Sequence, residues 1–313
     1  MICFLSAERE RGRYETKGRD NMSTSGIEPT EAGTVPAGNS ASPAGNQPFP
    51  GRDFPTPLPN SLAPSDTSED VRNRRDGVRR EVAVLPVGSF EQHGAHLPLA
   101  TDTLVACAIA REIAAAHPVH LLPPVTISCS HEHAGWPGTV SISSVTLHAV
   151  VRDIAESLRR SGVDALVLVN GHGGNYVLGN VVQESVGSGT RMALFPAPED
   201  WEAARVAAGV QTSLLSDMHA GEIETSILLH THPESVRPGY ETTDFLADDR
   251  RHLLTTGMAA YTESGVIGRP SLASAEKGKA LLAELADSFD AYFSLLTSDA
   301  VLPGDTAADR RRP

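Results

Sequence analysis

Hydrophobic and polar positions follow two alternating patterns between residues 81 and 300. Short, nearly continuous apolar runs predict buried strands at 82–87, 120–126, 165–169 and 192–195, the second of which is interrupted by two prolines. Segments with an apolar residue every three or four positions predict helices at 103–116, 145–160, 176–185, 221–230 and 276–296. Alternating strands and helices are typical of an α/β fold, in which helices cover both faces of a mostly parallel sheet. The functional site of such a fold lies beyond the carboxyl ends of the strands.

Residues 1–78 show neither pattern. They contain nine prolines between Pro29 and Pro64 and are rich in glycine and serine, so they cannot bury enough apolar surface to offset their ordering entropy. We therefore expect a disordered tail at 1–78, one folded domain at 79–300 and a second disordered tail at 301–313. The first region is either a true tail or an overlong start, with Met22 as the alternative initiator.

The chain carries a net charge of -13, from 26 basic and 39 acidic side chains. The first 80 residues hold equal numbers of both signs, so the whole excess lies in the predicted domain. An acidic domain argues against a nucleic acid or an anionic membrane as a partner. The three cysteines are scattered, no apolar run reaches about 20 residues, and charged residues follow the apolar MICFL start. These features predict a cytoplasmic protein.

The first segment that concentrates polar chemistry, GSFEQHGAHLPLATD, follows the strand predicted at 82–87. Glu91 and His93 are two residues apart, so an extended backbone would point both side chains to one side. Together with Asp102, they offer the carboxylate and imidazole groups that bind zinc or manganese. The alternative is a polar loop in which Asp102 only caps the next helix.

The second segment, NGHGGN at 170–175, follows the strand predicted at 165–169. Its glycines permit close backbone approach, which would press His172 into a site. A phosphate-binding loop is disfavoured, because the segment lacks the lysine and the glycine spacing of such loops. A tight turn with an incidental histidine is the alternative.

The third segment is HAGEIETS at 219–226. If a helix begins near Gly221, a rotation of about 100° per residue sets Glu224 within the apolar stripe and Glu222 on the opposite, solvated face. A carboxylate in an apolar stripe is costly unless it is paired or binds a metal. Glu224 is therefore a candidate ligand, with a buried ion pair as the alternative.

Two further segments are weaker candidates. His131 and His133 lie in SCSHEHAGWPGT, where we expect His133 to line a pocket with Trp136 as its apolar wall, rather than to form a separate metal pair. We do not expect Ser89 to be a nucleophile, because GSFEQ does not match the G-x-S-x-G elbow.

The blocks GSFEQHGAHLPLATDT, NGHGGN and HAGEIETS, in this order, resemble the signature blocks of the creatininase (creatinine amidohydrolase) family. HEHAGWPGTVSI and ESGVIGRPSLASAEKG resemble weaker blocks of the same family, so the resemblance spans about residues 82–296. It implies a three-layer α/β/α sandwich with a mostly parallel sheet, two divalent metal ions and a homo-oligomer, commonly a hexamer.

The resemblance also implies roles for individual residues. Four residues match the metal ligands of the family by position: Glu91, His93, Asp102 and His172. Asp102 would bridge the two ions, and His219 matches a histidine assigned to proton transfer. Creatininase has a glutamate where this chain has Gly174, so the last ligand would come from elsewhere, and Glu224 is the candidate.

The implied reaction is hydrolysis of an amide or lactam C–N bond of a small molecule by a metal-bound hydroxide. Zinc is the expected metal, with manganese or iron as alternatives. Because GHGGN serves other members of the family, a mycofactocin precursor peptidase that releases a C-terminal dipeptide is an alternative, and a non-catalytic metal-binding scaffold is a second one. The partner would be a small-molecule or short-peptide amide, in a pocket that includes His133, Trp136 and Gly174.

Overall fold

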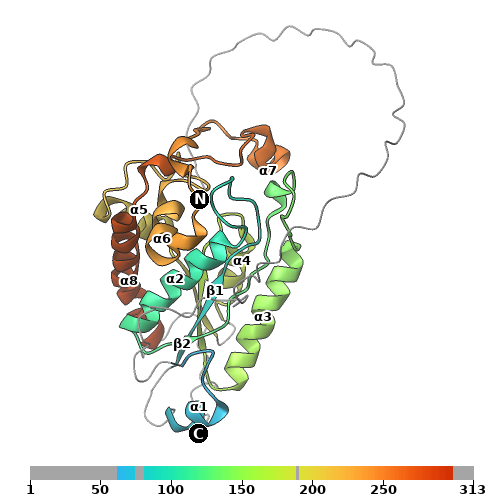
Figure 1. The fold of residues 1–313 in the computed structure, drawn as a ribbon. Coiled ribbons are helices and arrows are strands. Elements are labelled where there is room, and N and C mark those ends of the chain that lie inside the picture. Colours follow the sequence, from blue (N-terminus) through green and yellow to red (C-terminus); the bar gives the residue numbers. More distant parts are fainter. Residues whose placement is uncertain (1–61, 75–80, 188–189, 299–313) are drawn as a thin grey trace, which may run out of the picture. The chain divides into compact units, whose positions relative to one another are not determined.

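The computed structural model describes residues 62–74, 81–187 and 190–298, all within one compact unit that spans Phe54–Pro313. The centre of this unit is a parallel four-stranded sheet in the order β2–β1–β3–β4 (Figure 1). Its strands are β1 (Val82–Val87), β2 (His120–Leu121), β3 (Ala165–Asn170) and β4 (Arg191–Phe195). The parallel sheet predicted from the apolar runs is confirmed.

Helices cover both faces of the sheet. Along β1, Val82 and Val84 belong to one hydrophobic cluster and Ala83 and Leu85 to another, as expected for side chains that alternate between faces. The first cluster is completed by α2 (Thr101–Ala116), α5 (Pro198–Ala207), α6 (Glu222–Thr231) and α8 (Ala275–Thr297). The second is completed by α3 (Ser144–Arg160) and α4 (Val177–Glu184). These layers confirm the predicted α/β/α sandwich (Figure 1).

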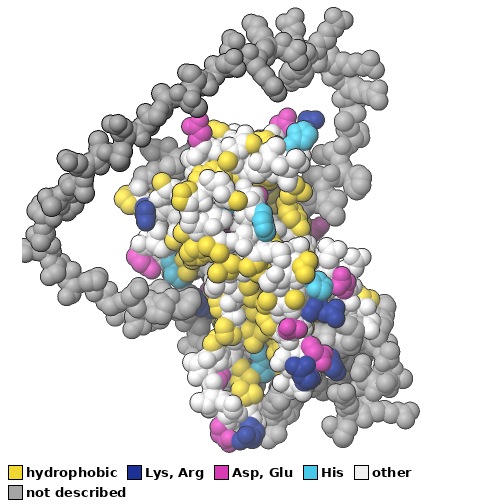
Figure 2. Space-filling model, turned by 90° about the vertical axis from the view of Figure 1, so that its right-hand side faces the viewer, with side chains coloured by type: hydrophobic (Ala, Val, Ile, Leu, Met, Phe, Trp, Pro, Cys, Tyr) yellow, Lys and Arg dark blue, Asp and Glu magenta, His cyan; other side chains and the backbone are white. Residues whose placement is uncertain are grey.

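Short elements complete the described chain. They are α1 (Ser68–Arg74), α7 (Leu253–Thr256) and the 3-10 turns η1 (His131–His133), η2 (Pro233–Ser235), η3 (Tyr240–Thr242), η4 (Met258–Ala260) and η5 (Pro270–Leu272). Among the described helices, none combines the length and the apolar character needed to cross a bilayer. Figure 2 shows a face on which hydrophobic side chains form a broad band. Among the described residues, Val145, Val186 and Leu254 are some of the most exposed large apolar side chains.

Three local predictions differ from the structure. The helix predicted at 103–116 begins at Thr101, so Asp102 lies inside the first turn and does not cap it. The strand predicted at 120–126 ends at Leu121, because the prolines that follow cannot donate to a ladder; a single bridge joins Val87 to Val125. Helix α5 was not predicted, although Pro198 at its first position and Asp200, which accepts the backbone N–H of Ala197, are typical start signals.

Part of the segment expected to be a disordered tail is ordered. Leu62 is buried, donates its backbone N–H to Val119 and accepts that of Leu121, so it extends the edge of the sheet beside β2. Ser68–Arg74 forms α1. Backbone pairing at a sheet edge supplies order that side-chain periodicity cannot reveal. Residues 1–61 and 75–78 of the first predicted tail and all of the predicted tail at 301–313 lie outside the described residues.

Candidate metal centre

The loops that follow β1 and β3 meet at the carboxyl edge of the sheet, where the first turn of α2 packs against them. Two glycines make this close packing possible. A Cβ atom at Gly171 would lie 2.3 Å from the carbonyl oxygen of Asp102, and one at Gly88 would lie 2.4 Å from Cα of Thr103. Because β1 and β3 are neighbours in the sheet, the loops that follow them both contact the first turn of α2, which contains Asp102.

One group of candidate ligands consists of Glu91, Asp102 and His172, all of them buried. Nδ1 of His172 lies 3.3 Å from Oε1 of Glu91 and 3.1 Å from Oδ2 of Asp102. Ser89 also donates to Oδ2 of Asp102, at 2.6 Å, which makes it a support for this carboxylate. The three ligand atoms are close enough to share one cation.

A second group consists of His93, His219 and Glu224. Nε2 of His93 lies 3.9 Å from Oε1 of Glu224 and 3.0 Å from Oδ1 of Asp102. Asp102 therefore directs one carboxylate oxygen to His93 and the other to His172. This is the arrangement that a carboxylate bridging two ions would need.

The hydrogen-bond partners assign the ring tautomer at three of these histidines. His93 donates Nδ1–H to the carbonyl of Glu91, His172 donates Nε2–H to that of Cys129, and His219 donates Nε2–H to that of Gln92. A carbonyl can only accept, so the other nitrogen of each uncharged ring carries a lone pair. In each case that nitrogen faces the carboxylates. Backbone anchoring of this kind is how metal-binding histidines are oriented.

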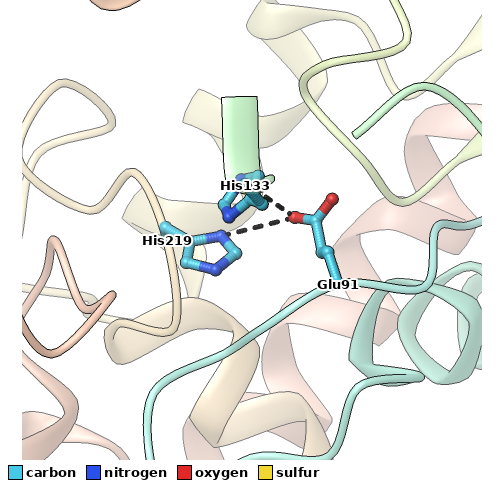
Figure 3. A group of neighbouring side chains, drawn as sticks. All are labelled: Glu91, His133 and His219. Carbon is cyan, nitrogen blue, oxygen red and sulfur yellow. Dashed lines mark ion pairs between the residues drawn. The ribbon is translucent and has the colours of Figure 1, made fainter. Parts of the chain in front are cut away.

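His133 lies beside His219 and faces Glu91 (Figure 3), but its proton is on the opposite side of the ring. The side-chain oxygen of Gln92 accepts the N–H of Gly94, so its amide nitrogen is the donor that contacts the carbonyl of Gly265 and Nδ1 of His133. His133 must accept at Nδ1, and its proton is therefore on Nε2. This Nε2 lies 3.1 Å from Oε1 of Glu91, but neither oxygen of Glu91 has an aligned hydrogen bond in the described part of the chain.

The electrostatics of the group favour a cation. Burial raises the pKa of Glu91 to about 7 and that of Glu224 to about 8. Burial opposes the charged form of His93, but the neighbouring Asp102 outweighs it and raises the pKa of His93 to about 10. The centre thus retains protons at neutral pH, because three carboxylates share a poorly solvated volume. Glu91 in particular has two buried oxygens without hydrogen bonds, which suits a metal ligand.

Burial and the proximity of other imidazoles lower the pKa of two rings. His219 lies beside His93 and His133, and its pKa is well below the usual value. Burial and the nearby His172 lower the pKa of His133 to about 3. Both rings are uncharged at neutral pH, one presenting a lone pair and the other an N–H group.

Position 174 has no room for a side chain, because Glu132 and His172 occupy the space that a Cβ atom would need. A Cβ atom there would lie 1.9 Å from Oε1 of Glu132 and 2.4 Å from Nε2 of His172. Glu132 approaches that same nitrogen to 3.3 Å, so a carboxylate from η1 fills the volume that a side chain at 174 would need. Trp136, the predicted pocket wall, has its ring centroid 6.3 Å from that of His133.

One prediction about the third segment is wrong. Glu222 is fully buried rather than solvated. Its carboxylate accepts from Thr212 and from Lys277 of α8, the latter at 2.6 Å. Glu224, in contrast, is half-buried, faces His93 and accepts the N–H of Ala220. The structure therefore brings Glu91, His93, Asp102, His172, His219 and Glu224 together and directs Glu222 elsewhere.

Three residues that support the centre are not predicted from the sequence as parts of it: Ser89, Gln92 and Glu132. Their positions relative to the first segment and to NGHGGN depend on contacts between distant loops. The signal available was that HEH and EQH combine carboxylate, amide and imidazole groups in glycine-containing loops.

The same combination of fold and centre is found in known proteins. The creatininase family model, described as creatinine amidohydrolase, matches residues 66–292. This chain belongs to the creatininase family. The resemblance predicted from the three sequence blocks is therefore confirmed.

Individual members of the creatininase family differ in what they act on. The mycofactocin precursor peptide peptidase of Mycolicibacterium smegmatis is 35% identical over 213 residues, which cover 65% of this chain and 81% of the relative. The creatinine amidohydrolase of Pseudomonas putida is 29% identical over 174 residues, 50% of this chain and 66% of the relative. Both names describe hydrolases of C–N bonds, so the predicted enzyme class is confirmed.

Solved creatininases share the fold. A manganese form superposes with a TM-score of 0.63 at 22% identity, covering 74% of this chain and 96% of that chain. A creatinine amidohydrolase structure gives a TM-score of 0.60 at 24% identity, with coverage of 70% and 92%.

Proposed function

We propose that this protein is a metal-dependent hydrolase that cleaves an amide bond of a peptide. The observation that carries the proposal is the convergence of three carboxylates and three imidazoles, each imidazole anchored to a backbone carbonyl so that its other nitrogen faces the carboxylates, on one buried volume. A peptide is favoured as substrate because the mycofactocin precursor peptidases, at 35–36% identity, match this chain better than the creatinine amidohydrolase does. The product would be a C-terminal dipeptide, which the family resemblance implies as the alternative to hydrolysis of a small molecule.

Two divalent cations fit the donor set. Glu91 and His172 would hold one, His93 and Glu224 the other, with Asp102 shared between them. Mixed nitrogen and oxygen ligands suit zinc or manganese, and solved creatininases include manganese and zinc forms. When bound, such ions supply Lewis acidity that polarises an amide carbonyl and acidifies water.

The residues of this chain would then position and move protons. Nδ1 of His219 carries the lone pair and lies 3.8 Å from Oε1 of Glu91, at the inner edge of the centre. A burial-lowered pKa keeps this nitrogen free to accept a proton. We assign His219 to receive a proton released on attack and to deliver it to the leaving nitrogen.

The test is a substrate screen of purified protein, stripped of metal and reloaded with zinc or manganese. The panel contains short peptides with free C-termini, creatinine, small lactams and formamides. Release of a C-terminal dipeptide, dependent on metal and lost in Asp102→Asn and His172→Ala, would support the proposal. Metal-loaded protein that leaves every amide intact would refute it and favour the scaffold alternative. Protein that takes up no metal would refute both.

A lactam such as creatinine is the second candidate substrate, supported by the relationship to the Pseudomonas putida creatinine amidohydrolase. One observation disfavours creatinine as the substrate: this chain has Gly174 at the position where the resemblance to creatininase implies a glutamate. Trp136 and Gly174 stay predicted pocket residues. The homo-oligomer stays a prediction, which the apolar band in Figure 2 supports. Cytoplasmic location also stays a prediction.

A further inference from the structure

His133 belongs to a group of three residues, with Glu91 and His219, whose atoms lie close enough to hold a metal (Figure 3). The proximity of these atoms does not decide whether the ring nitrogen that faces Glu91 carries a lone pair or a proton. The hydrogen-bond partner of the other nitrogen of each ring decides it. For His133 the partner is Gln92, and for His219 it is the Gln92 carbonyl.

The orientation of the Gln92 amide is fixed by backbone groups. Its oxygen accepts the N–H of Gly94 at 2.9 Å, and its nitrogen donates to the carbonyl of Gly265 at 3.2 Å. Reversing the amide would break both contacts. Nδ1 of His133, 3.0 Å from that nitrogen, is therefore an acceptor, and Nε2 carries the proton. An uncharged ring in this tautomer has no lone pair to give to a metal at Nε2.

The Nε2–H group of His133 faces a carboxylate oxygen that has no hydrogen bond of its own. The ring is almost completely buried, and Nε2 lies 3.1 Å from Oε1 of Glu91. That oxygen makes no aligned hydrogen bond with the described residues, so the N–H group is not committed to it. The group points into the centre, where the lone pair of His219 faces from the other side; the two ring centroids are 4.4 Å apart.

We propose that His133 is a catalytic hydrogen-bond donor that binds the oxygen of the scissile amide through Nε2–H and does not bind a metal. The inference rests on the proposed hydrolase function and adds a residue to it. The amide oxygen gains negative charge as the carbonyl is attacked, and a fixed, uncharged N–H group in a dry site binds that charge more tightly than it binds the starting amide. Gln92 is the positioning residue, because it sets the tautomer.

Three variants separate the two roles. His133→Gln keeps an N–H group near the position of Nε2, whereas His133→Asn places its amide near Nδ1 and removes the inner donor. His131→Asn is the matched control, since His131 lies in the same turn but is exposed and contacts Ser141. Each variant is measured for zinc content, thermal unfolding, and kcat and KM on the peptide substrate found in the screen.

We expect His133→Asn to retain two zinc ions per chain and to lose about 10²–10³-fold in kcat with little change in KM, as for the loss of one oxyanion donor. His133→Gln should recover most of that loss, and His131→Asn should match the wild type. Imidazole ¹⁵N spectra of the metal-free protein should show His133 protonated at Nε2.

Loss of zinc from His133→Asn, a proton on Nδ1, or full kcat without the inner donor would each overturn the inference. Failure of the wild-type enzyme to hydrolyse any amide would instead overturn the proposed function. If His133→Asn does not fold, His133→Gln and the tautomer spectrum decide the question.

Discussion

Binding of zinc to the metal-free protein should release protons, and the number follows from the geometry. The pKa of His93 is raised to about 10 by Asp102, and burial raises that of Glu224 to about 8. Burial opposes the charged form of His172, but Glu91 and Asp102 outweigh it and hold its pKa well above the usual value, so all three groups are mainly protonated at pH 7. Metal ligands must be deprotonated, so three protons leave when these side chains bind zinc. Glu91, whose pKa is raised to about 7, adds a fourth proton below neutral pH.

The affinity for zinc should therefore rise steeply with pH. Release of about three protons makes the dissociation constant fall about 1000-fold per pH unit near pH 7, equivalent to about 4.1 kcal/mol. The dependence should weaken above pH 8, where Glu224 is already ionised, and persist more gently at higher pH through His93 and His172. Isothermal titration calorimetry in two non-chelating buffers of different ionisation enthalpy measures the proton count directly.

Glu224→Gln provides the matched control for this measurement. Its amide oxygen remains a possible ligand but carries no proton that must leave, so the count at pH 7 should fall from about three to about two. A zinc affinity that is flat between pH 6 and pH 8, or an unchanged proton count in Glu224→Gln, would refute the assignment of His93 and Glu224 to the centre.

Three other variants test separate contacts. Asp102→Asn should fold but lose metal-dependent hydrolysis, measured as turnover beside the metal content, and full turnover would contradict the bridging role. Gly174→Ala should weaken zinc binding about 10–100-fold in a competition titration, because its Cβ displaces Glu132 and the ring of His172; wild-type affinity would show that this packing is irrelevant. Lys277→Met should lower the free energy of unfolding in urea by about 3 kcal/mol, since it leaves Glu222 buried without its cation; no loss would mean that the donors from Thr212 suffice.

The strands were predictable because their burial is a local property of the sequence. Val82–Val87 and the run from Ala165 are continuous apolar segments, and a strand buried on both faces needs no other signal. The ends of the helices were harder to predict from the sequence. Asp102 is a residue type that commonly caps helices, yet α2 begins at Thr101. Its first turn packs against two glycines of neighbouring loops, a contact that the sequence of the helix does not indicate.

The two glutamates of α6 show where local periodicity fails. The rotation argument assumes one buried and one solvated face, but α6 packs against both α2 and α8 and is buried on most sides. Glu222 is stabilised there by Lys277, which is 55 residues away in the chain. A pairing over that distance leaves no trace in a helical period, so the rotation argument predicts the environment of Glu224 correctly and that of Glu222 wrongly.

Gln92 links the two uncharged histidines in a way that a list of ligands does not reveal. Its backbone carbonyl accepts the proton of His219, and its side-chain amide donates to His133, so one residue holds the two rings in opposite tautomers. The lone pair of His219 and the N–H of His133 both face Oε1 of Glu91. Hydrolysis of an amide needs both properties at once, because a proton must be accepted while negative charge develops on oxygen. A side chain at position 92 that could only accept a hydrogen bond would leave the contact between the backbone carbonyl and His219 unchanged. It would, however, hold the proton of His133 on Nδ1 instead of Nε2.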